Sequence, residues 1–170
     1  MTESYTGILH TEGKTAAVLI DIDGVLCHID WDCEPYEFNW EEFKEKDKDR
    51  ETLWQGVGLA RMMIQAGLYP VFLTARHEGM REQTEEFLAE IGMHGILVMA
   101  SEGSDEVDDN YQQTQAYGKE KELEKLVKIF CFVYAIDDQE PNCEIYREFG
   151  IPVLRAMFTD NEFISGGDHE

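Results

Sequence analysis

The stretch from Thr15 to Val25 constrains the fold more than any other part of the chain. It is an apolar run that ends in two acidic residues one position apart and then a glycine. An apolar run rich in β-branched residues indicates a strand buried on both faces, as found in parallel sheets. We therefore predict a central strand over residues 15–23.

Asp21 and Asp23 stand at the carboxyl end of this strand. Side chains two positions apart on a strand point the same way, so the two carboxylates are expected to converge on one spot. Gly24 allows the chain to turn sharply just after them. Because neighbouring carboxylates repel one another, the pair predicts a cation or a proton between them.

Length and composition limit the class of protein. A chain of 170 residues, 43% of them hydrophobic, is expected to form one domain over residues 1–170. There is no apolar run of about 18 residues, and the N-terminus lacks the basic start and apolar core of a signal peptide. A soluble, cytoplasmic protein is expected. The 4 cysteines have no C-x-x-C spacing and are expected to be reduced.

The formal net charge of −22 is extreme for this length. It favours cation binding and repels nucleic acid at long range. Few basic residues are available to build a groove for a nucleic acid. Those expected near the strand ends are Arg76, His77, Arg81 and Arg155.

The order of the remaining patterns predicts a three-layer α/β fold. Further strands are expected at 69–73, 96–99, 129–136 and 151–154, and helices at 39–48, 51–66, 78–91, 118–127 and 140–149. Alternating strands and helices with short connections imply right-handed crossovers and a parallel sheet. Pro152 indicates that the last strand lies at an edge, because proline cannot donate to the ladder.

Two segments do not fit this alternation. Residues 27–50 mix many charges with the aromatic residues Trp31, Tyr36, Phe38, Trp40 and Phe43. Because they follow the two carboxylates directly, they are either a small lid over them or a surface excursion packed on the core. Residues 101–116 are polar and acidic, and either a solvated loop or a flap is expected.

Three predicted strands end in polar residues: Asp21 and Asp23, Thr74 and Arg76, and Asp137 and Asp138. In open parallel sheets ligands bind at the carboxyl ends of the strands, so these groups meet if the strands are neighbours. One carboxylate can attack phosphorus while a second transfers protons, and Asp21 and Asp23 fit these roles. Asp137 and Asp138 would complete an oxygen shell suited to Mg²⁺. A hydroxyl and a lysine would contact the phosphoryl group.

The residues resemble the four motifs of haloacid dehalogenase-type phosphatases. The matching segments are Asp21-Ile22-Asp23-Gly24-Val25, Leu73-Thr74-Ala75-Arg76, a helix-borne lysine, and Ile136-Asp137-Asp138. The resemblance spans residues 15–157. It implies a Rossmann-like fold with about five strands in the order 3-2-1-4-5, a small cap insertion at 27–50, Mg²⁺ dependence and an aspartyl-phosphate intermediate.

The same resemblance implies a role for each residue. Asp21 is the nucleophile and a metal ligand. Asp23 is the acid/base and offers the metal its backbone carbonyl. Asp137 and Asp138 hold the metal, and Thr74, Ala75 and Arg76 bind the substrate. The lysine is expected to be Lys119, at the start of its helix, with Lys121 as the open alternative.

A narrower resemblance concerns Ala135–Asp138 and Glu144–Ile151, which are similar to the phosphatase domain of bacteriophage polynucleotide kinase–phosphatase. That family removes 3′-phosphates from nucleic acid ends, which implies a polynucleotide 3′-phosphatase or nucleotide phosphatase. No G-x-x-x-x-G-K-[ST] motif for a kinase is present. Val25 and Gln139 depart from the family pattern, which tends to have threonine and arginine there.

Two other functions stay open at this point. A phosphatase of small phosphorylated metabolites would use the aromatic segment as its specificity lid. An acidic binding module that has lost catalysis would explain the net charge, although the intact pair Asp21 and Asp23 argues against it.

Overall fold

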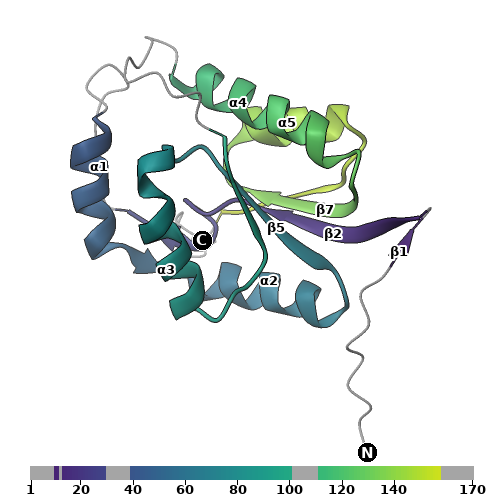
Figure 1. Ribbon diagram of the computed structural model, residues 1–170, viewed down its shortest axis with the longest axis horizontal. Helices are drawn as coiled ribbons and strands as arrows, with labels where there is room; N and C mark the ends of the chain where they lie inside the picture. Colours follow the sequence, from purple (N-terminus) through teal and green to yellow (C-terminus); the bar gives the residue numbers. More distant parts are fainter. Residues whose placement is uncertain (1–9, 12, 30–38, 101–110, 158–170) are drawn as a thin grey trace, which may run out of the picture.

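A mostly parallel β-sheet forms the centre of the computed structural model, which describes residues 10–11, 13–29, 39–100 and 111–157 (Figure 1). The strands are β1 His10–Thr11, β2 Lys14–Ile20, β5 Tyr69–Thr74, β6 Ile96–Met99, β7 Phe130–Asp137 and β8 Val153–Arg155. Their order is β6-β5-β2-β7-β8, with parallel neighbours, and β1 pairs antiparallel with β2. The predicted α/β class and the order 3-2-1-4-5 are confirmed.

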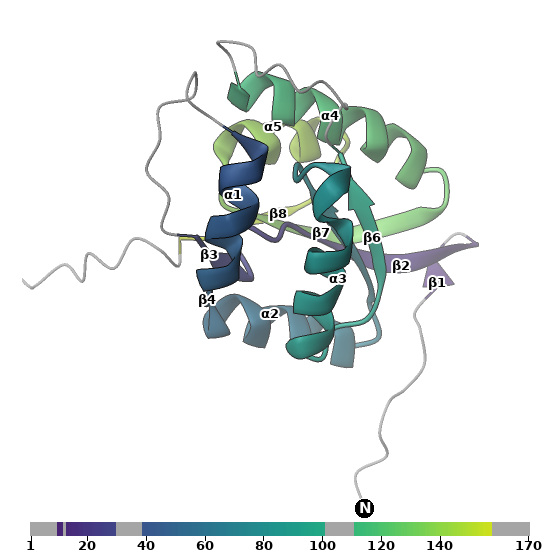
Figure 2. The same cartoon turned by 60° about the vertical axis from the view of Figure 1, so that its left-hand side comes forward.

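Helices cover both faces of this sheet (Figure 2). One face carries α2 Trp54–Gln65 and α3 Arg81–Glu90, the latter entered through the 3₁₀ turn η3 Glu78–Met80. The other carries α4 Tyr111–Leu126 and α5 Glu140–Glu148. The layers enclose two apolar clusters, one on each side of the sheet.

Strand β2 contributes to both clusters. Val18 and Ile20 point to the side of α2 and α3, whereas Ala17 and Leu19 point to the side of α4 and α5. All four side chains are buried, as predicted for a central strand. Burying each large aliphatic side chain contributes about 1.5–3 kcal/mol, which makes β2 a major part of the core.

The insertion after β2 contains a small hairpin and a helix. Strand β3 Cys27–His28 pairs antiparallel with β4 Glu51–Thr52. The predicted helix at 39–48 is confirmed as α1 Trp40–Lys46, followed by the 3₁₀ turn η2 Asp47–Asp49. The Asn39 side chain caps α1 by accepting from the backbone N–H groups of Glu41 and Glu42. Trp31, Tyr36 and Phe38 lie outside the described residues.

Two helices begin at residues other than those predicted. The helix expected at 51–66 begins at Trp54, because Glu51 and Thr52 pair in β4. The helix expected at 118–127 begins at Tyr111, within the segment predicted to be a loop or flap. Residues 111–117 lack the apolar spacing that marks a helix, so the sequence pattern missed its first two turns. The rest of that segment, 101–110, lies outside the described residues.

The described residues contain no helix both long and apolar enough to cross a membrane.

Gly118 sets how closely α4 packs on the sheet. A β-carbon at this position would overlap the carbonyl oxygen of Ala100, which follows β6. The close approach also fixes the next residue, Lys119, whose side chain is 1% exposed. A glycine in the middle of a helix normally costs stability, so this one is explained by packing.

We predict that Gly118→Ala lowers the free energy of unfolding by about 1–3 kcal/mol, because the added methyl group must push α4 off the sheet. Gly58→Ala is the matched control, since a β-carbon there has no heavy atom within 4 Å of it. It should raise the same free energy by about 0.5–1 kcal/mol through helix propensity. Urea unfolding measures both. Equal effects of the two substitutions would contradict the packing argument.

Candidate active site

The polar residues after β2, β5 and β7 meet at one edge of the sheet. β2 is flanked by β5 and β7, so Asp21, Thr74 and Asp137 stand at the ends of three adjacent parallel strands. Oxygen atoms of Asp21, Asp137 and Asp138 all lie within 4.8 Å of one another. Such a group of carboxylate oxygens has the chemistry of a site for a hard divalent cation.

Lys119 of α4 lies among these carboxylates. Its Nζ is 2.9 Å from Asp21 Oδ2 and 2.8 Å from Asp137 Oδ2. Burial alone would lower the pKa of Lys119, but Asp137 and Asp21 outweigh burial and raise it, so the ammonium stays charged. The alternative lysine, Lys121, has its Nζ 4.6 Å from the centre of the Tyr117 ring.

Residues of helix α5 also donate hydrogen bonds to Asp137. The Tyr146 hydroxyl donates to Asp137 Oδ2 at 2.8 Å, and the Asn142 amide donates to Oδ1 at 3.0 Å. The backbone N–H of Gln139 also donates to Oδ1, at 3.0 Å. Sequence reasoning missed Asn142 and Tyr146. Their spacing of four on one helix, starting five residues after Asp137, is the signal that could have found them.

The surroundings of Asp138 and Asp21 disfavour the charged forms of both side chains. Among the described residues Asp138 Oδ1 is buried without a hydrogen-bond partner, while Oδ2 accepts from Gln139 Nε2 at 2.8 Å. Burial, and then Asp137, raise the pKa of Asp138 to about 6. Burial, and then Asp137, also raise the pKa of Asp21. One lysine does not balance three acids, so the cluster favours an additional positive charge.

Gly24 permits this crowding. Its φ is 73°, in the left-handed region that favours glycine. A β-carbon at Gly24 would overlap the Asp138 carboxylate. The turn therefore brings the loop after β2 directly against the residue that follows β7.

The side chains of Asp21 and Asp23 have different partners. Strand β2 ends at Ile20, so the alternation of a strand no longer applies at Asp23. The Asp23 carboxylate instead pairs with Arg76, from Nε to Oδ2 at 2.9 Å and from Nη2 to Oδ1 at 2.7 Å. Its side-chain oxygens are not part of the carboxylate group that could hold a metal.

Arg76 is buried and joins Asp23 to the insertion. Its Nη2 lies 2.8 Å from Asp47 Oδ1, and the Asp47 side chain is fully buried. Asp47 Oδ2 accepts from Arg50 Nη1 at 3.1 Å and from Gln83 Nε2 at 2.5 Å. Burial would lower the pKa of Arg76, but Asp23 outweighs it and raises that pKa. The guanidinium predicted to bind substrate is thus already paired with two carboxylates.

Thr74 and Ala75 complete this edge. Thr74 is fully buried, and its Oγ1 accepts from the Arg76 backbone N–H at 3.2 Å. Ala75 is half-buried between them. Asp47, in contrast, was not singled out from the sequence, because an acid among many acids in residues 39–50 has no distinguishing local signal.

The sequence matches the family described as the polynucleotide kinase PNKP phosphatase domain over residues 15–161. The chain belongs to this family. It is a phosphatase of the haloacid dehalogenase type, as its motifs predicted, and Asp21, Lys119 and Asp137 lie together in the family's fold. No curated protein matches the chain.

Two chains of solved complexes share this fold. A chain of the Pnkp1/Rnl/Hen1 complex matches with a TM-score of 0.66 and 22% identity, covering 91% of this chain and 50% of that one. A chain of the Pnkp1/Rnl/Hen1 RNA repair complex matches with a TM-score of 0.67 and 21% identity, covering 91% and 46%. The chain therefore spans about half the length of these structures.

For this phosphatase we predict that Asp47→Asn lowers the free energy of unfolding by about 3 kcal/mol, because it leaves the buried guanidinium of Arg76 with one carboxylate fewer. Asp49→Asn changes an exposed acid of the same 3₁₀ turn and should change stability by less than about 0.5 kcal/mol. Denaturant unfolding of both variants checks this. An Asp47→Asn protein as stable as the Asp49→Asn protein would show that the pair does not tie the insertion to the sheet.

Proposed function

We propose that the protein hydrolyses phosphomonoesters through an aspartyl-phosphate at Asp21, and that its substrates are polynucleotide 3′-phosphates or nucleotides. The observation that carries the proposal is the group of Asp21, Asp137 and Asp138 around Lys119. It lies at the carboxyl edge of the sheet, in a chain that matches the polynucleotide kinase PNKP phosphatase domain. Asp23 stands two residues beyond Asp21 on the same loop.

The first half of the reaction forms the covalent intermediate. An oxygen of Asp21 attacks phosphorus, the bond from phosphorus to the ester oxygen breaks, and Asp23 gives its proton to the departing alcohol. Lys119, 2.9 Å from Asp21 Oδ2, is placed to neutralise charge on the phosphoryl oxygens. Thr74 stands at the end of the adjacent strand, where its hydroxyl can donate to one of those oxygens.

The second half regenerates the enzyme. Asp23, now a carboxylate, takes a proton from water, and the resulting hydroxide attacks phosphorus. The bond to Asp21 breaks and inorganic phosphate leaves. The Asp23 side chain is 37% exposed, so water can reach it, while Arg76 fixes its direction. Asp21 itself is nearly buried, which keeps competing nucleophiles from it.

The same carboxylates fit a divalent cation such as Mg²⁺. The fit rests on three acids against one lysine, and on the unpartnered Asp138 Oδ1. Asp21, Asp137 and Asp138 would hold the ion, with the backbone carbonyl of Asp23 as a further oxygen ligand. When bound, the ion would supply positive charge against the phosphoryl oxygens.

The family supports a polynucleotide as the substrate, whereas the net charge of the chain opposes it. The family's description names a polynucleotide enzyme, whereas a net charge of −22 repels a long strand. A terminal phosphate or a nucleotide reconciles the two. The second candidate, a phosphatase of small metabolites, is favoured only by this charge. A bacteriophage source and a cytoplasmic location remain predictions of the sequence.

A substrate panel tests the proposal. With Mg²⁺, phosphate release from a 3′-phosphorylated oligonucleotide and from 3′-nucleotides should exceed release from sugar phosphates, and EDTA should abolish it. Asp21→Asn should reduce kcat by at least roughly 10³-fold. Brisk turnover of sugar phosphates with none of the oligonucleotide would establish the metabolite alternative.

Separate roles for the two aspartates predict a distinct behaviour of Asp23→Asn. With p-nitrophenyl phosphate, whose leaving group needs no proton, this variant should still form the intermediate but hydrolyse it slowly. A burst of p-nitrophenol close to one equivalent per enzyme is expected in stopped-flow measurements. Linear release at the wild-type rate would show that Asp23 is not the acid/base.

The raised pKa of Asp138 predicts how stability depends on pH. Its folded pKa of about 6 lies above the unfolded value of about 4, so between these pH values only the folded chain holds the proton. Without Mg²⁺, Asp138 therefore makes the fold progressively less stable as pH rises from about 4 to about 6. Above that range it leaves a cost on the order of 3 kcal/mol.

Asp138→Asn should accordingly make the metal-free protein more stable than wild type near pH 7.5 and as stable near pH 4. Mg²⁺ should raise the Tm of wild type near pH 7.5 but not that of the variant. Thermal unfolding with EDTA or Mg²⁺ measures both, with Asp49→Asn as the control for loss of an acid. A variant less stable than wild type near pH 7.5 in EDTA would contradict the account.

A further inference from the structure

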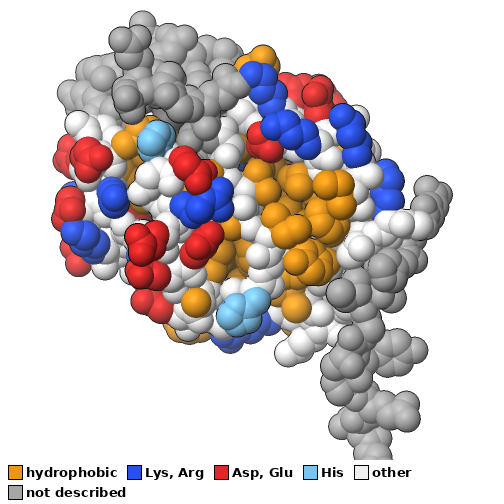
Figure 3. Space-filling model, in the orientation of Figure 1, with side chains coloured by type: hydrophobic (Ala, Val, Ile, Leu, Met, Phe, Trp, Pro, Cys, Tyr) orange, Lys and Arg blue, Asp and Glu red, His pale blue; other side chains and the backbone are white. Residues whose placement is uncertain are grey.

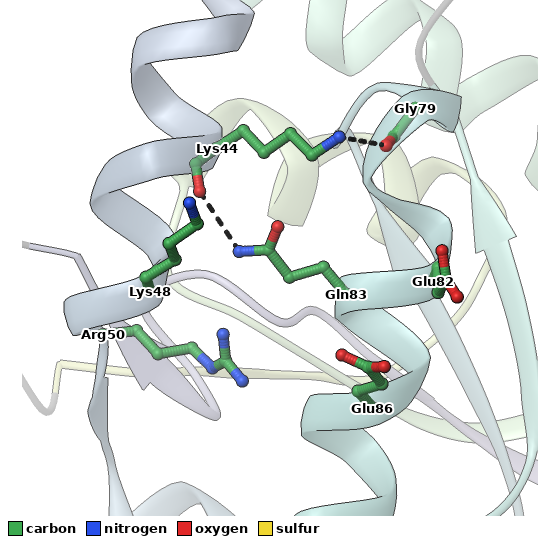
Figure 4. Close-up of a pocket in the computed structure, with 7 residues that line it drawn as sticks. All are labelled: Lys44, Lys48, Arg50, Gly79, Glu82, Gln83 and Glu86. Atoms are coloured by element: carbon green, nitrogen blue, oxygen red, sulfur yellow. Dashed lines mark hydrogen bonds between the residues drawn. The ribbon is translucent and has the colours of Figure 1, made fainter.

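A second polar cavity lies outside the carboxylate cluster. It has a volume of about 510 Å³, is open to solvent and lies between α1, η2 and α3 (Figure 4). Lys44, Lys48 and Arg50 line it from the insertion, and Glu82, Gln83 and Glu86 line it from α3. Pockets for small molecules typically have volumes of about 300–1,000 Å³, so this groove has room for one unit of a larger ligand.

The cations of this cavity are notable in so acidic a chain. The chain has 14 Lys and Arg against 36 Asp and Glu, and on the face seen in Figure 3 its basic side chains over α1 and α3 stand among acidic ones. Lys44 Nζ donates to the Gly79 carbonyl at 3.2 Å, one of the three hydrogen bonds an ammonium can donate. Lys48 Nζ pairs with Glu45 Oε2 at 2.5 Å in an exposed ion pair, which a stronger anion can replace.

The side chains that line the cavity from α3 favour a nucleotide over inorganic phosphate as its occupant. Glu82 and Glu86 are exposed acids, which would repel inorganic phosphate. They can accept hydrogen bonds from sugar hydroxyls or base amino groups. Gln83 is held between the walls, since its Nε2 donates to Lys44 O at 3.2 Å. The cavity thus offers donors for a phosphodiester on one side and acceptors for a sugar or base on the other.

The cavity is close to the proposed acid/base. Lys44 follows Phe43, whose ring centre is 5.8 Å from Arg76 Cζ. Lys48 follows Asp47, whose Oδ1 is 2.8 Å from Arg76 Nη2. Arg76 in turn binds Asp23. The sequence neighbours of Lys44 and Lys48 therefore contact Arg76, the arginine that pairs with Asp23.

We propose that this cavity binds a nucleotide unit of the nucleic-acid strand whose terminal phosphate is removed. The proposal rests on the polynucleotide phosphatase function argued above. Lys44 and Lys48 hold the backbone phosphate, and Glu82 and Glu86 contact the sugar or base. Arg50 lines the cavity with its guanidinium already paired with Asp47 and Glu90. A local cationic site explains how a chain of net charge −22 retains a strand.

Matched charge reversals test the site. Lys48→Glu alters the cavity, whereas Lys46→Glu makes the same change at an exposed residue of α1 that does not line it. Both are placed in the Asp21→Asn background, and binding of a labelled single-stranded octanucleotide with a 3′-phosphate is measured by fluorescence anisotropy. We expect Lys48→Glu to weaken binding about 5–10-fold more than Lys46→Glu, and the salt dependence of log Kd to become shallower by roughly 0.7.

Lys44→Gln serves as a second variant if Lys48→Glu lowers the Tm. It removes one charge from the cavity and should weaken binding about 3–5-fold. Equal effects of Lys46→Glu and Lys48→Glu, or no binding of the octanucleotide at low salt, would overturn the proposal. Failure of the proposed function has a different signature: no phosphate release from any monoester by the unmodified protein, whatever the difference in Kd.

Discussion

The contact of Lys119 with Asp21 and Asp137 is the interaction on which the rest of the site depends. A buried ammonium between two buried carboxylates is tolerated only because each partner offsets the desolvation of the other. Much of the surrounding architecture serves this arrangement. Gly118 lets α4 approach the sheet closely enough to deliver Lys119. Tyr146 and Asn142 fix the far side of Asp137. The single positive charge of Lys119 does not balance the carboxylates of Asp21, Asp137 and Asp138, which is why a divalent cation suits the cluster.

A second buried network ties the insertion to the same site. Arg76 binds Asp23 from the sheet and Asp47 from the insertion, so the position of α1 and the direction of the Asp23 carboxylate are coupled. A segment held only by surface contacts would have no such influence. The insertion is therefore part of the machinery that orients the proposed acid/base, and its outer face carries the cations of the adjoining cavity.

Much of the fold was predictable because its signals are local. The apolar pattern of residues 15–23 predicts a buried strand, and the glycines and polar residues indicate where strands end. The order of the motifs predicts which strand ends lie together. What the sequence pattern could not show was decided by distant partners. The direction of Asp23 depends on Arg76, 53 positions away. The importance of Asp47 depends on its burial beside the same arginine. Lys119 was the lysine expected from its place in the helix, and packing supplies its contacts with Asp21 and Asp137. Tyr146 and Asn142 were within reach of a helical-face argument, whereas Asp47 was not.

The most direct test of the account is to identify the residue that carries the phosphoryl group during turnover. The enzyme would be quenched while hydrolysing a 3′-phosphorylated oligonucleotide, treated with borohydride to reduce any acyl phosphate to an alcohol, and analysed by peptide mass spectrometry. The account predicts reduction at residue 21 alone, and none without substrate or in Asp21→Asn. Reduction at Asp23, Asp137 or Asp138 instead, or turnover with residue 21 never modified, would contradict it.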